Sequence, residues 1–459
     1  MKKLKPLFTP KSIAVIGASR NKNSVGYGIL YNLLHGGVYH TLFNHPFKGM
    51  VYAINPYANK ILGLKCYDSI KDIKERIDLA VIAVKANLVP KIIKECSEKK
   101  VKALIIISAG FAELNDEGKM LQAKICSIIK NSNMVLVGPN CLGIINTNKN
   151  LNASFAPAMP PKGPVSFISQ SGALADSVID WAIEKYYGLS KVISYGNAAC
   201  LNINDFLLYL SKDKHTKAIA IYIESIKDGR KFMRIAKNIK KPIIVLKAGR
   251  TEKALKAVSS HTGNLAGSYQ VYKVAFEQSN VYLADSVNEL FNIAWVQATQ
   301  PKLKSNSIAI ITNGGGAGIL AADACIFNNL KLAKLNKRFI KKLSRNKLMH
   351  PAWSRNNPID LVGDALPSRY EIAINETLKQ KNVAGLMVIQ TLQTMTDPVA
   401  NAKIIVKAKQ QFPKKPIIAV YMGGKFTKPG KVYLKAHKVP VYNDINKATI
   451  AMKSLITNY

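Results

Sequence analysis

The chain has 459 residues, of which 48% are apolar, so it is long enough for two or three domains with substantial cores. Its 66 Lys and Arg residues against 27 Asp and Glu residues give a net charge of +39, which indicates anionic partners: nucleic acid, an acidic protein or phosphorylated small molecules. The lysines are scattered along the chain, which disfavours specific nucleic-acid recognition. A compositional bias toward Lys, Ile and Asn would give the same charge without a functional meaning.

Membrane and secretion signals are missing from the sequence. The first residues, MKKLKPLFTPKSIAVIGAS, lack a long apolar core with a cleavage site. No run reaches the roughly 18 to 20 apolar residues that span a bilayer. The 6 cysteines contain no CxxC pair and form no regular framework. We therefore expect a cytoplasmic, reduced protein with no membrane partner.

The first block of the chain alternates short apolar runs with amphipathic segments. The runs are 12–19, 50–56, 79–84, 103–110 and 134–140. Unalternating β-branched runs of this kind are typical of buried parallel strands in βαβ units. The proline-rich stretch PAMPPKGP (157–164) follows as a junction.

The residues directly after the first run suit a phosphate site. Gly17 to Arg20 and then Ser24 to Gly28 form a small-residue turn before an expected helix, where backbone N–H groups bind phosphate. The turn does not match GxGxxG, and the second run ends in Asn55-Pro56 without an acid, so a nicotinamide dinucleotide is disfavoured. A tight strand-to-helix turn needing small residues is the structural alternative.

The second block repeats this pattern with runs at 164–172, 191–197, 218–225 and 242–249. Ser169 to Ala173 lead from the first of these runs into the expected helix ALADSVIDWAIEKY, whose N-terminus suits an anion. An N-cap by Ser169 or Ser171 explains the serines equally well.

One histidine of this block is placed among small and hydroxyl residues. His261 lies in SSHTGNLAGSY (259–269), a composition that suits a bent segment. It lacks a second metal ligand nearby, a serine partner at fixed spacing and the apolar neighbours of a core histidine, so we predict no metal site and favour phosphoryl acceptance. Glu224, at the end of the run 218–225, could hold its ring by one nitrogen and leave the other free to attack phosphorus. Alone, Glu224 would be a solvated strand end.

The third block has runs at 308–318, 385–391 and 416–424, and the first contains the glycine-rich turn Thr312 to Gly318. The sequence thus predicts an α/β protein of three doubly wound domains. We place them at residues 1–150, 160–298 and 306–459.

Several stretches together carry a family resemblance. They are SIAVIGASR (12–20), GPNCLG (138–143), ISQSGAL (168–174), YIESIKDGRKF (222–232), SSHTGNLAGSY (259–269) and NPIDLVGDA (357–365). Nearly the whole chain resembles the α subunit of ADP-forming acetate:CoA ligases, the NDP-forming acyl-CoA synthetases of the succinyl-CoA synthetase superfamily. The resemblance implies a CoA-binding Rossmann-like domain followed by two flavodoxin-like domains.

The resemblance also implies a role for each matching residue. His261 would become phosphorylated, and Glu224 would stabilise the phosphohistidine. Ser171, Gly172 and Ala173 would bind phosphate. The CoA site would comprise Ser19, Arg20, Ser24, Val25, Gly26, Asn55, Pro56, Val84, Lys85, Ser108, Ala109, Gly110, Asn140 and Cys141. Acyl-CoA, ADP and phosphate would give a carboxylate, CoA and ATP through an acyl phosphate.

Two departures from the family pattern affect the expected partners. No ATP-grasp domain fits after the third block, so ADP or ATP with Mg²⁺ is expected on a separate ATP-grasp β subunit, in an α2β2 hetero-oligomer. The acidic stretch usual in the family is here Gly196 to Cys200, which leaves contacts from those side chains open. The alternative function is a non-catalytic acyl-CoA-binding or regulatory protein of the same fold, although CoA binding alone needs neither His261 nor Glu224.

Overall fold

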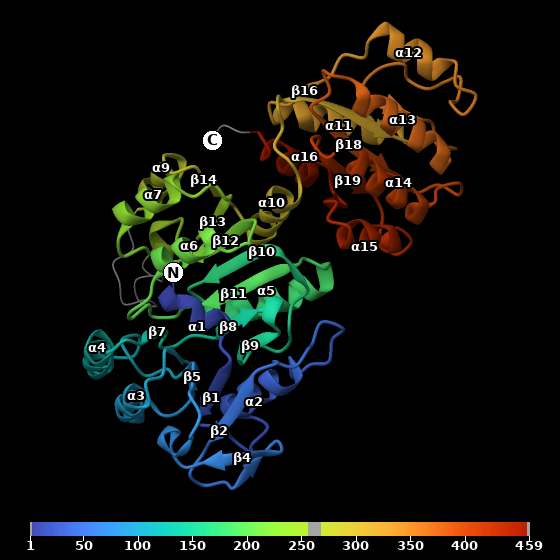
Figure 1. Ribbon diagram of the computed structural model, residues 1–459. Helices are drawn as coiled ribbons and strands as arrows, with labels where there is room; N and C mark the ends of the chain where they lie inside the picture. The colour runs from blue at the N-terminus through green and yellow to red at the C-terminus, as the bar shows by residue number, and fades with distance from the viewer. Residues whose placement is uncertain (1, 256–267, 457–459) are drawn as a thin grey trace. The chain divides into compact units, whose positions relative to one another are not determined.

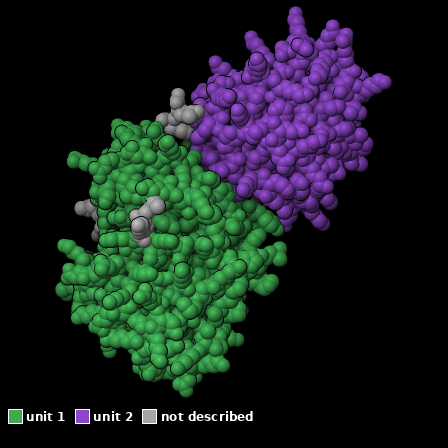
Figure 2. Space-filling model, viewed as in Figure 1, with its two compact units in different colours: residues 1–290 green, residues 291–459 purple. Residues whose placement is uncertain are grey.

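The computed structural model describes residues 2–255 and 268–456. The chain forms two compact units, Met1–Leu290 and Phe291–Tyr459, which Figure 2 distinguishes by colour. Across the described ranges, every helix is too short or too polar to cross a bilayer. The cysteines are all free thiols.

The first sheet of unit 1 has the strand order β3-β4-β2-β1-β5-β6-β7 (Figure 1). Its strands are β1 (Ser12–Ile16), β2 (Met50–Ile54), β3 (Lys60–Ile61), β4 (Leu64–Tyr67), β5 (Leu79–Ile82), β6 (Ala103–Ile106) and β7 (Val135–Val137). Apart from the β3–β4 hairpin, the strands are parallel and follow the Rossmann order, with the reversal between β1 and β5. The five apolar runs predicted in this block are confirmed as strands.

Helices cover both faces of this sheet. They are α1 (Lys5–Phe8), α2 (Val25–His35), α3 (Val89–Glu98) and α4 (Asp116–Lys130), with short 3-10 turns at Lys2–Leu4, Ile70–Asp72, Ala86–Leu88 and Thr147–Lys149. Because successive strand residues point to opposite faces, Ile13 and Val15 share a core with α2, while Ala14 and Ile16 share one with α3 and α4. This two-sided burial explains why the strands read as continuous apolar runs.

The second sheet, also in unit 1, has the order β14-β13-β12-β10-β11-β8-β9. Its strands are β8 (Gly143–Asn146), β9 (Leu151–Ser154), β10 (Lys162–Ser169), β11 (Leu189–Ser194), β12 (Ala218–Ile223), β13 (Ile243–Lys247) and β14 (Val281–Leu283). The parallel strands follow the flavodoxin order, and the antiparallel hairpin β8–β9 extends the sheet beyond β11. β8, which falls within the expected domain 1–150, thus pairs with the second sheet. Its helices are α5 (Gly172–Lys185), α6 (Ile203–Lys212), α7 (Gly229–Lys237) and α9 (Tyr269–Glu277).

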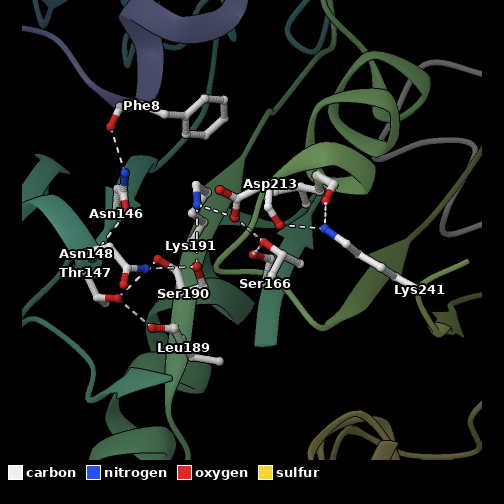
Figure 3. A network of polar contacts seen from close by, with 12 residues as sticks. Phe8, Asn146, Thr147, Asn148, Ser166, Leu189, Ser190, Lys191, Asp213 and Lys241 are labelled. Atoms are coloured by element: carbon white, nitrogen blue, oxygen red, sulfur yellow. Dashed lines mark hydrogen bonds and ion pairs between the residues drawn. The ribbon is translucent and has the colours of Figure 1, made fainter. Parts of the chain in front are cut away.

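A buried polar network joins the amino ends of strands in this sheet (Figure 3). Lys191 of β11 is 1% exposed, and its Nζ lies 2.6 Å from the Asp213 carboxylate. Asp213 also accepts a hydrogen bond from the Thr216 hydroxyl, which contacts the Ser166 hydroxyl of β10. Lys241 donates to the backbone carbonyl of Asp213. The network is structural, because it lies at the sheet edge opposite the one where ligands bind in such folds.

The third sheet lies in unit 2, with the order β16-β15-β18-β19-β20 and β17 paired with β15. Its strands are β15 (Ser307–Thr312), β16 (Lys331–Leu332), β17 (Ile359–Asp360), β18 (Gly385–Gln390), β19 (Ile417–Tyr421) and β20 (Val441–Tyr442). The helices of unit 2 are α11 (Gly315–Phe327), α12 (Lys337–Ser344), α13 (Pro367–Lys379), α14 (Pro398–Gln411), α15 (Lys428–Ala436) and α16 (Ile445–Lys453), and the division between the units falls within α10 (Val287–Thr299). This is again the flavodoxin order, so three parallel-rich α/β sheets are confirmed.

Candidate active site

Unit 1 contains a cleft of about 660 Å³ at the carboxyl ends of its parallel strands. Residues that follow β5, β6, β7, β10, β11 and β12 line it, so it draws on both sheets of the unit. From the predicted set, the cleft brings together Val25, Val84, Ser108, Ala109, Asn140, Cys141, Ser171, Gly172, Ala173 and Glu224. Ligands bind at this edge in doubly wound sheets, which makes the cleft the candidate active site.

The turn from β1 to α2 is closely packed. Gly17 has φ +92°, and a Cβ on Gly26 would lie 1.9 Å from the Gly17 carbonyl oxygen. Ser24 caps α2 by accepting a hydrogen bond from the Tyr27 backbone N–H. Small residues are thus needed for packing here, as the structural alternative held. Of the predicted residues on this turn, Val25 lines the cleft, while Ser19, Arg20, Ser24 and Gly26 do not.

The other predicted residues outside the cleft lining are Asn55, Pro56, Lys85 and Gly110. The Asn55 side-chain amide donates to the Ala18 carbonyl over 2.7 Å, which ties the end of β2 to the turn after β1. Pro56 and Lys85 are exposed. Gly110, at φ +100°, donates its backbone N–H to the Glu113 carboxylate.

Cys141 lines the cleft but is a poor nucleophile. Its side chain is 4% exposed and its thiol donates to the Ile106 carbonyl. Burial raises the pKa of Cys141 to about 12. Its neighbour Asn140 is exposed, in the left-handed conformation at φ 56°, and its side-chain amide donates to Asn197. Because its thiol is buried and protonated, Cys141 lines the cleft as a packing residue and not as a nucleophile.

The turn after β10 presents the N-terminus of α5 to the cleft. Ser171 is the N-cap of α5, and its Oγ accepts a hydrogen bond from the Leu174 backbone N–H at 3.2 Å. The capping alternative is thus correct for Ser171, whereas the Ser169 hydroxyl donates to the Ser171 carbonyl. Capping leaves the amides of the first helical turn available, since these have no intrahelical acceptors. Gly172 and Ala173 in that turn line the cleft, where they can bind an anion.

Glu224 follows β12 directly and is 6% exposed, so it is a buried residue of the cleft. The Gln170 side-chain oxygen accepts hydrogen bonds from the backbone N–H groups of Glu224 and Ser225. Gln170 therefore fixes the backbone that carries the carboxylate. Sequence reasoning overlooked this residue, although it lies within the quoted turn ISQSGAL.

The loop Gly196 to Cys200 borders the same cleft. A Cβ on Gly196, at φ +51°, would lie 2.2 Å from the Asn140 carbonyl oxygen. Asn197 donates its side-chain N–H groups to Glu113 and Gln122. Burial disfavours the charged Glu113, but hydrogen bonds from Asn197 and from backbone N–H groups outweigh it and lower its pKa. The loop thus uses an amide to hold a carboxylate, which settles the contact that the sequence left open.

Among the cleft residues that the sequence did not predict, three carry buried polar atoms without a partner among the described residues. The Asp176 Oδ1, the Tyr195 hydroxyl and the Asn204 Oδ1 are buried and have no hydrogen-bond partner in the described part of the chain. Burial raises the pKa of Asp176 to about 7. Burial, and then the negative charge of Glu224, raises the pKa of Tyr195. Each of these residues lies within or next to an expected helix or strand, so no local sequence pattern marks it as a site residue. The tertiary structure brings the three to the cleft. His261 lies outside the described residues.

Three family models match the chain in succession. A CoA binding domain matches residues 11–147, a succinyl-CoA ligase like flavodoxin domain matches 162–296, and a ligase-CoA domain matches 308–456. Together they cover the three sheets described above, apart from β9.

Relatives match over nearly the whole chain. Acetate--CoA ligase (ADP-forming) of Methanocaldococcus jannaschii is 44% identical over 444 residues, which are 96% of this chain and 61% of that protein. Acetate--CoA ligase (ADP-forming) I subunit alpha of Pyrococcus furiosus is 38% identical and covered to 97%, with 98% of this chain. The chain thus spans less than two thirds of the first relative and nearly all of the second.

A solved structure agrees with these matches. The dinucleotide forming acetyl-coenzyme A synthetase 1 of Ca. Korarchaeum cryptofilum, in complex with phosphate and ADP, has a TM-score of 0.91 to this chain at 35% identity. The superposition covers 99% of this chain and 96% of that one.

Proposed function

Because this chain belongs to the family of ADP-forming acetate–CoA ligase alpha subunits, with succinyl-CoA ligase-like domains, we propose that it is the catalytic alpha subunit of an ADP-forming acyl-CoA synthetase. In the proposed reaction, acyl-CoA, ADP and phosphate give a carboxylate, CoA and ATP. The observation that carries the proposal is the cleft, because it gathers a CoA-domain turn, a helix N-terminus suited to phosphate and a buried carboxylate.

CoA would bind along the carboxyl ends of the first sheet. The crevice between β1 and β5 is where the strand order reverses, which is the binding position in such folds. The predicted residues Ser19, Arg20, Ser24 and Gly26 lie on the β1–α2 turn at this crevice, and Val84 and Lys85 follow β5. Exposed Arg20 and Lys85 supply positive charge for phosphate groups of CoA.

Phosphate would bind at the N-terminus of α5. There it attacks the thioester carbonyl carbon, the carbon–sulfur bond breaks, and CoA leaves as its thiolate. The product is an acyl phosphate held by the amides of Gly172 and Ala173. A nitrogen of His261 then attacks phosphorus, the bond from phosphorus to the acyl oxygen breaks, and the carboxylate leaves.

Glu224 would orient and stabilise the phosphohistidine. A carboxylate that accepts a hydrogen bond from one ring nitrogen fixes the tautomer and leaves the other nitrogen as the nucleophile. The burial of Glu224 and its anchoring by Gln170 support this role, since a catalytic group has to be held in place.

The phosphoryl group would then pass to ADP on an ATP-grasp beta subunit, which would also hold Mg²⁺. The relatives in Pyrococcus furiosus are named as alpha subunits, and the Korarchaeum structure holds ADP and phosphate. These names support a hetero-oligomer with a beta subunit, and we propose for it the α2β2 composition that the family resemblance implies.

Incubation of the purified chain with acetyl-CoA and labelled phosphate tests the proposal. The expected result is an acid-labile, base-stable label on the protein, which passes to ADP when the ATP-grasp partner is added. His261→Asn should abolish the label, and Glu224→Gln should reduce it about 100-fold or more. His437→Asn, an exposed histidine of unit 2, is the matched control and should label normally.

Tight binding of CoA without any label, even with a competent partner, would favour the non-catalytic acyl-CoA-binding alternative. A label that persists in His261→Asn would assign phosphoryl acceptance to another residue.

A further inference from the structure

Besides Glu224, two carboxyl groups line the cleft, those of Asp176 and Asp228. Asp228 caps α7 by accepting a hydrogen bond from the Lys231 backbone N–H, whereas Asp176 has no such role and no step of the proposed reaction uses it. Asp176 lies on α5, four residues after Gly172, so the two share one face of the helix. Side chains on a helix lean toward its N-terminus. The carboxyl group therefore lies over the first turn of α5, beside the place where the acyl phosphate would form.

The Asp176 carboxyl group has a buried oxygen, Oδ1, without a hydrogen-bond partner among the described residues. Buried polar atoms in native proteins nearly always have a partner, because an unpaired one costs free energy. The Asn204 Oδ1, on a side chain that is 2% exposed, is a second buried acceptor of the same cleft without a partner. A ligand bound in the cleft can supply the hydrogen-bond donor that these two oxygens lack.

The chemistry of the substrates decides which ligand this is. Phosphate is an anion that an ionised carboxyl repels, and the thioester carbonyl offers only an acceptor. A donor on the acyl chain, a hydroxyl or an ammonium group, fits both acceptor oxygens. Apolar residues of the cleft, among them Leu142, Phe155 and Ile203, offer contact to the methylene groups between.

We propose that Asp176 determines acyl specificity by accepting a hydrogen bond from a hydroxyl or ammonium substituent of the acyl chain. The preferred substrates are then short hydroxyacyl- or aminoacyl-CoA thioesters rather than plain alkanoyl-CoA. The proposal rests on the proposed function and names its substrate class. The pKa of Asp176, raised to about 7 by burial, agrees with it, because a donor in the cleft would restore the ionised form.

Matched CoA thioesters test this, with the chain assayed together with its ATP-grasp partner. The pairs are butyryl-CoA against 3- and 4-hydroxybutyryl-CoA, and propionyl-CoA against β-alanyl-CoA. The expected kcat/KM is about 10- to 100-fold higher for the thioester with the donor, because the plain one leaves the buried acceptor unpaired.

Two variants separate the roles of the acceptor and its charge. Asp176→Leu should abolish the preference for both substituents. Asp176→Asn should keep the preference for hydroxyl and lose that for ammonium, since the amide oxygen accepts a hydrogen bond but carries no charge. Asp180→Leu, an exposed aspartate one turn further along α5, is the control and should leave every ratio unchanged. Thermal unfolding of Asp176→Leu should occur at the wild-type temperature or above, because the change removes an unpaired buried carboxyl.

Equal kcat/KM within every pair for the wild-type protein would overturn the proposal. So would an Asp176→Leu variant that slows all thioesters alike, because this would place the carboxyl against the pantetheine amides of CoA. Failure of the proposed function looks different, since no thioester of either kind would then produce a phosphoenzyme.

Discussion

Gln170 holds the backbone that carries Glu224 through two hydrogen bonds. Gln170→Met keeps the length of the side chain but leaves the backbone N–H groups of Glu224 and Ser225 without their acceptor. We expect a loss of about 1–3 kcal/mol in the free energy of unfolding and a slower formation of phosphoenzyme. Urea unfolding and single-turnover labelling measure the two effects.

Gln170→Glu is the matched control for that experiment. It retains an acceptor oxygen, so the free energy of unfolding at neutral pH should stay closer to wild type than in Gln170→Met. A methionine variant that labels at the wild-type rate would show that Glu224 holds its position without Gln170.

For single residues, the sequence predicted which strand ends form the site better than it predicted the contacts within the site. Ser171 and Glu224 were predicted because each follows an apolar run, and strand ends of a parallel sheet meet at one edge. Asp176 and Asn204 were not, because each lies inside a helix where a polar residue is ordinarily exposed. Their burial depends on what packs against the helix, which no local pattern encodes.

Among the elements, the β1–α2 turn gives a sharp contrast between two glycines. Gly26→Ala would place a Cβ 1.9 Å from the Gly17 carbonyl oxygen, whereas at Gly28 the nearest atom is 4.0 Å away. We expect Gly26→Ala to cost about 1–3 kcal/mol of stability and to weaken CoA binding by displacing the start of α2. Gly28→Ala should be neutral or stabilising, since alanine is the better helix former.

Thermal unfolding and calorimetric titration with CoA compare the two alanine variants directly. Equal effects of both substitutions would contradict the packing argument, because only one of them meets backbone.

The buried pair of Lys191 and Asp213 is the corresponding prediction for the second sheet. Lys191→Met or Asp213→Asn leaves a buried charge without its partner and should cost about 3–5 kcal/mol. The double variant Lys191→Met/Asp213→Leu should recover much of this loss, because apolar side chains replace the pair. Urea unfolding of the three variants checks both statements, and an additive loss in the double variant would show that the two charges do not interact.

The same pair predicts how stability depends on pH. Burial disfavours the charged Asp213, but hydrogen bonds from Lys191 and Thr216 and the charge of Lys191 outweigh it and lower its pKa. The unfolded chain therefore takes up this proton first as the pH falls. The contribution to stability is complete above the ordinary aspartate pKa of about 3.9 and is lost as the pH falls through the lower folded value. Asp213→Asn should flatten the acid limb of the unfolding profile.

The strands also show where sequence patterns stop being informative. Runs such as 79–84 and 218–225 were predicted because burial on both faces makes them continuously apolar. The hairpin of β8 and β9 was not, because Asn146, Asn152 and Ser154 interrupt its apolar pattern. Those polar residues are buried and hydrogen-bonded to backbone and side chains elsewhere in unit 1, for example Asn146 to the Phe8 carbonyl. These two strands thus depend on hydrogen bonds to distant residues, which no pattern of apolar residues in the sequence indicates.

For the whole molecule, the net charge of +39 leads to a prediction about binding to the proposed beta subunit. If the excess of 66 basic over 27 acidic residues attracts an acidic beta subunit, association has to weaken with salt. We expect the Kd for the partner to rise about tenfold or more between about 0.05 and about 0.5 M NaCl. Sedimentation or calorimetric titration of the purified subunits measures it.

Binding to a generic polyanion separates a fitted interface from charge alone. Duplex RNA should bind weakly, and its affinity should fall steeply with salt, because counterion release dominates such contacts. An interface with matched charges should instead keep part of its affinity at high salt, since apolar contacts remain there. A partner that is itself basic, with a Kd insensitive to salt, would show that the charge reflects composition and that other surfaces make the interface.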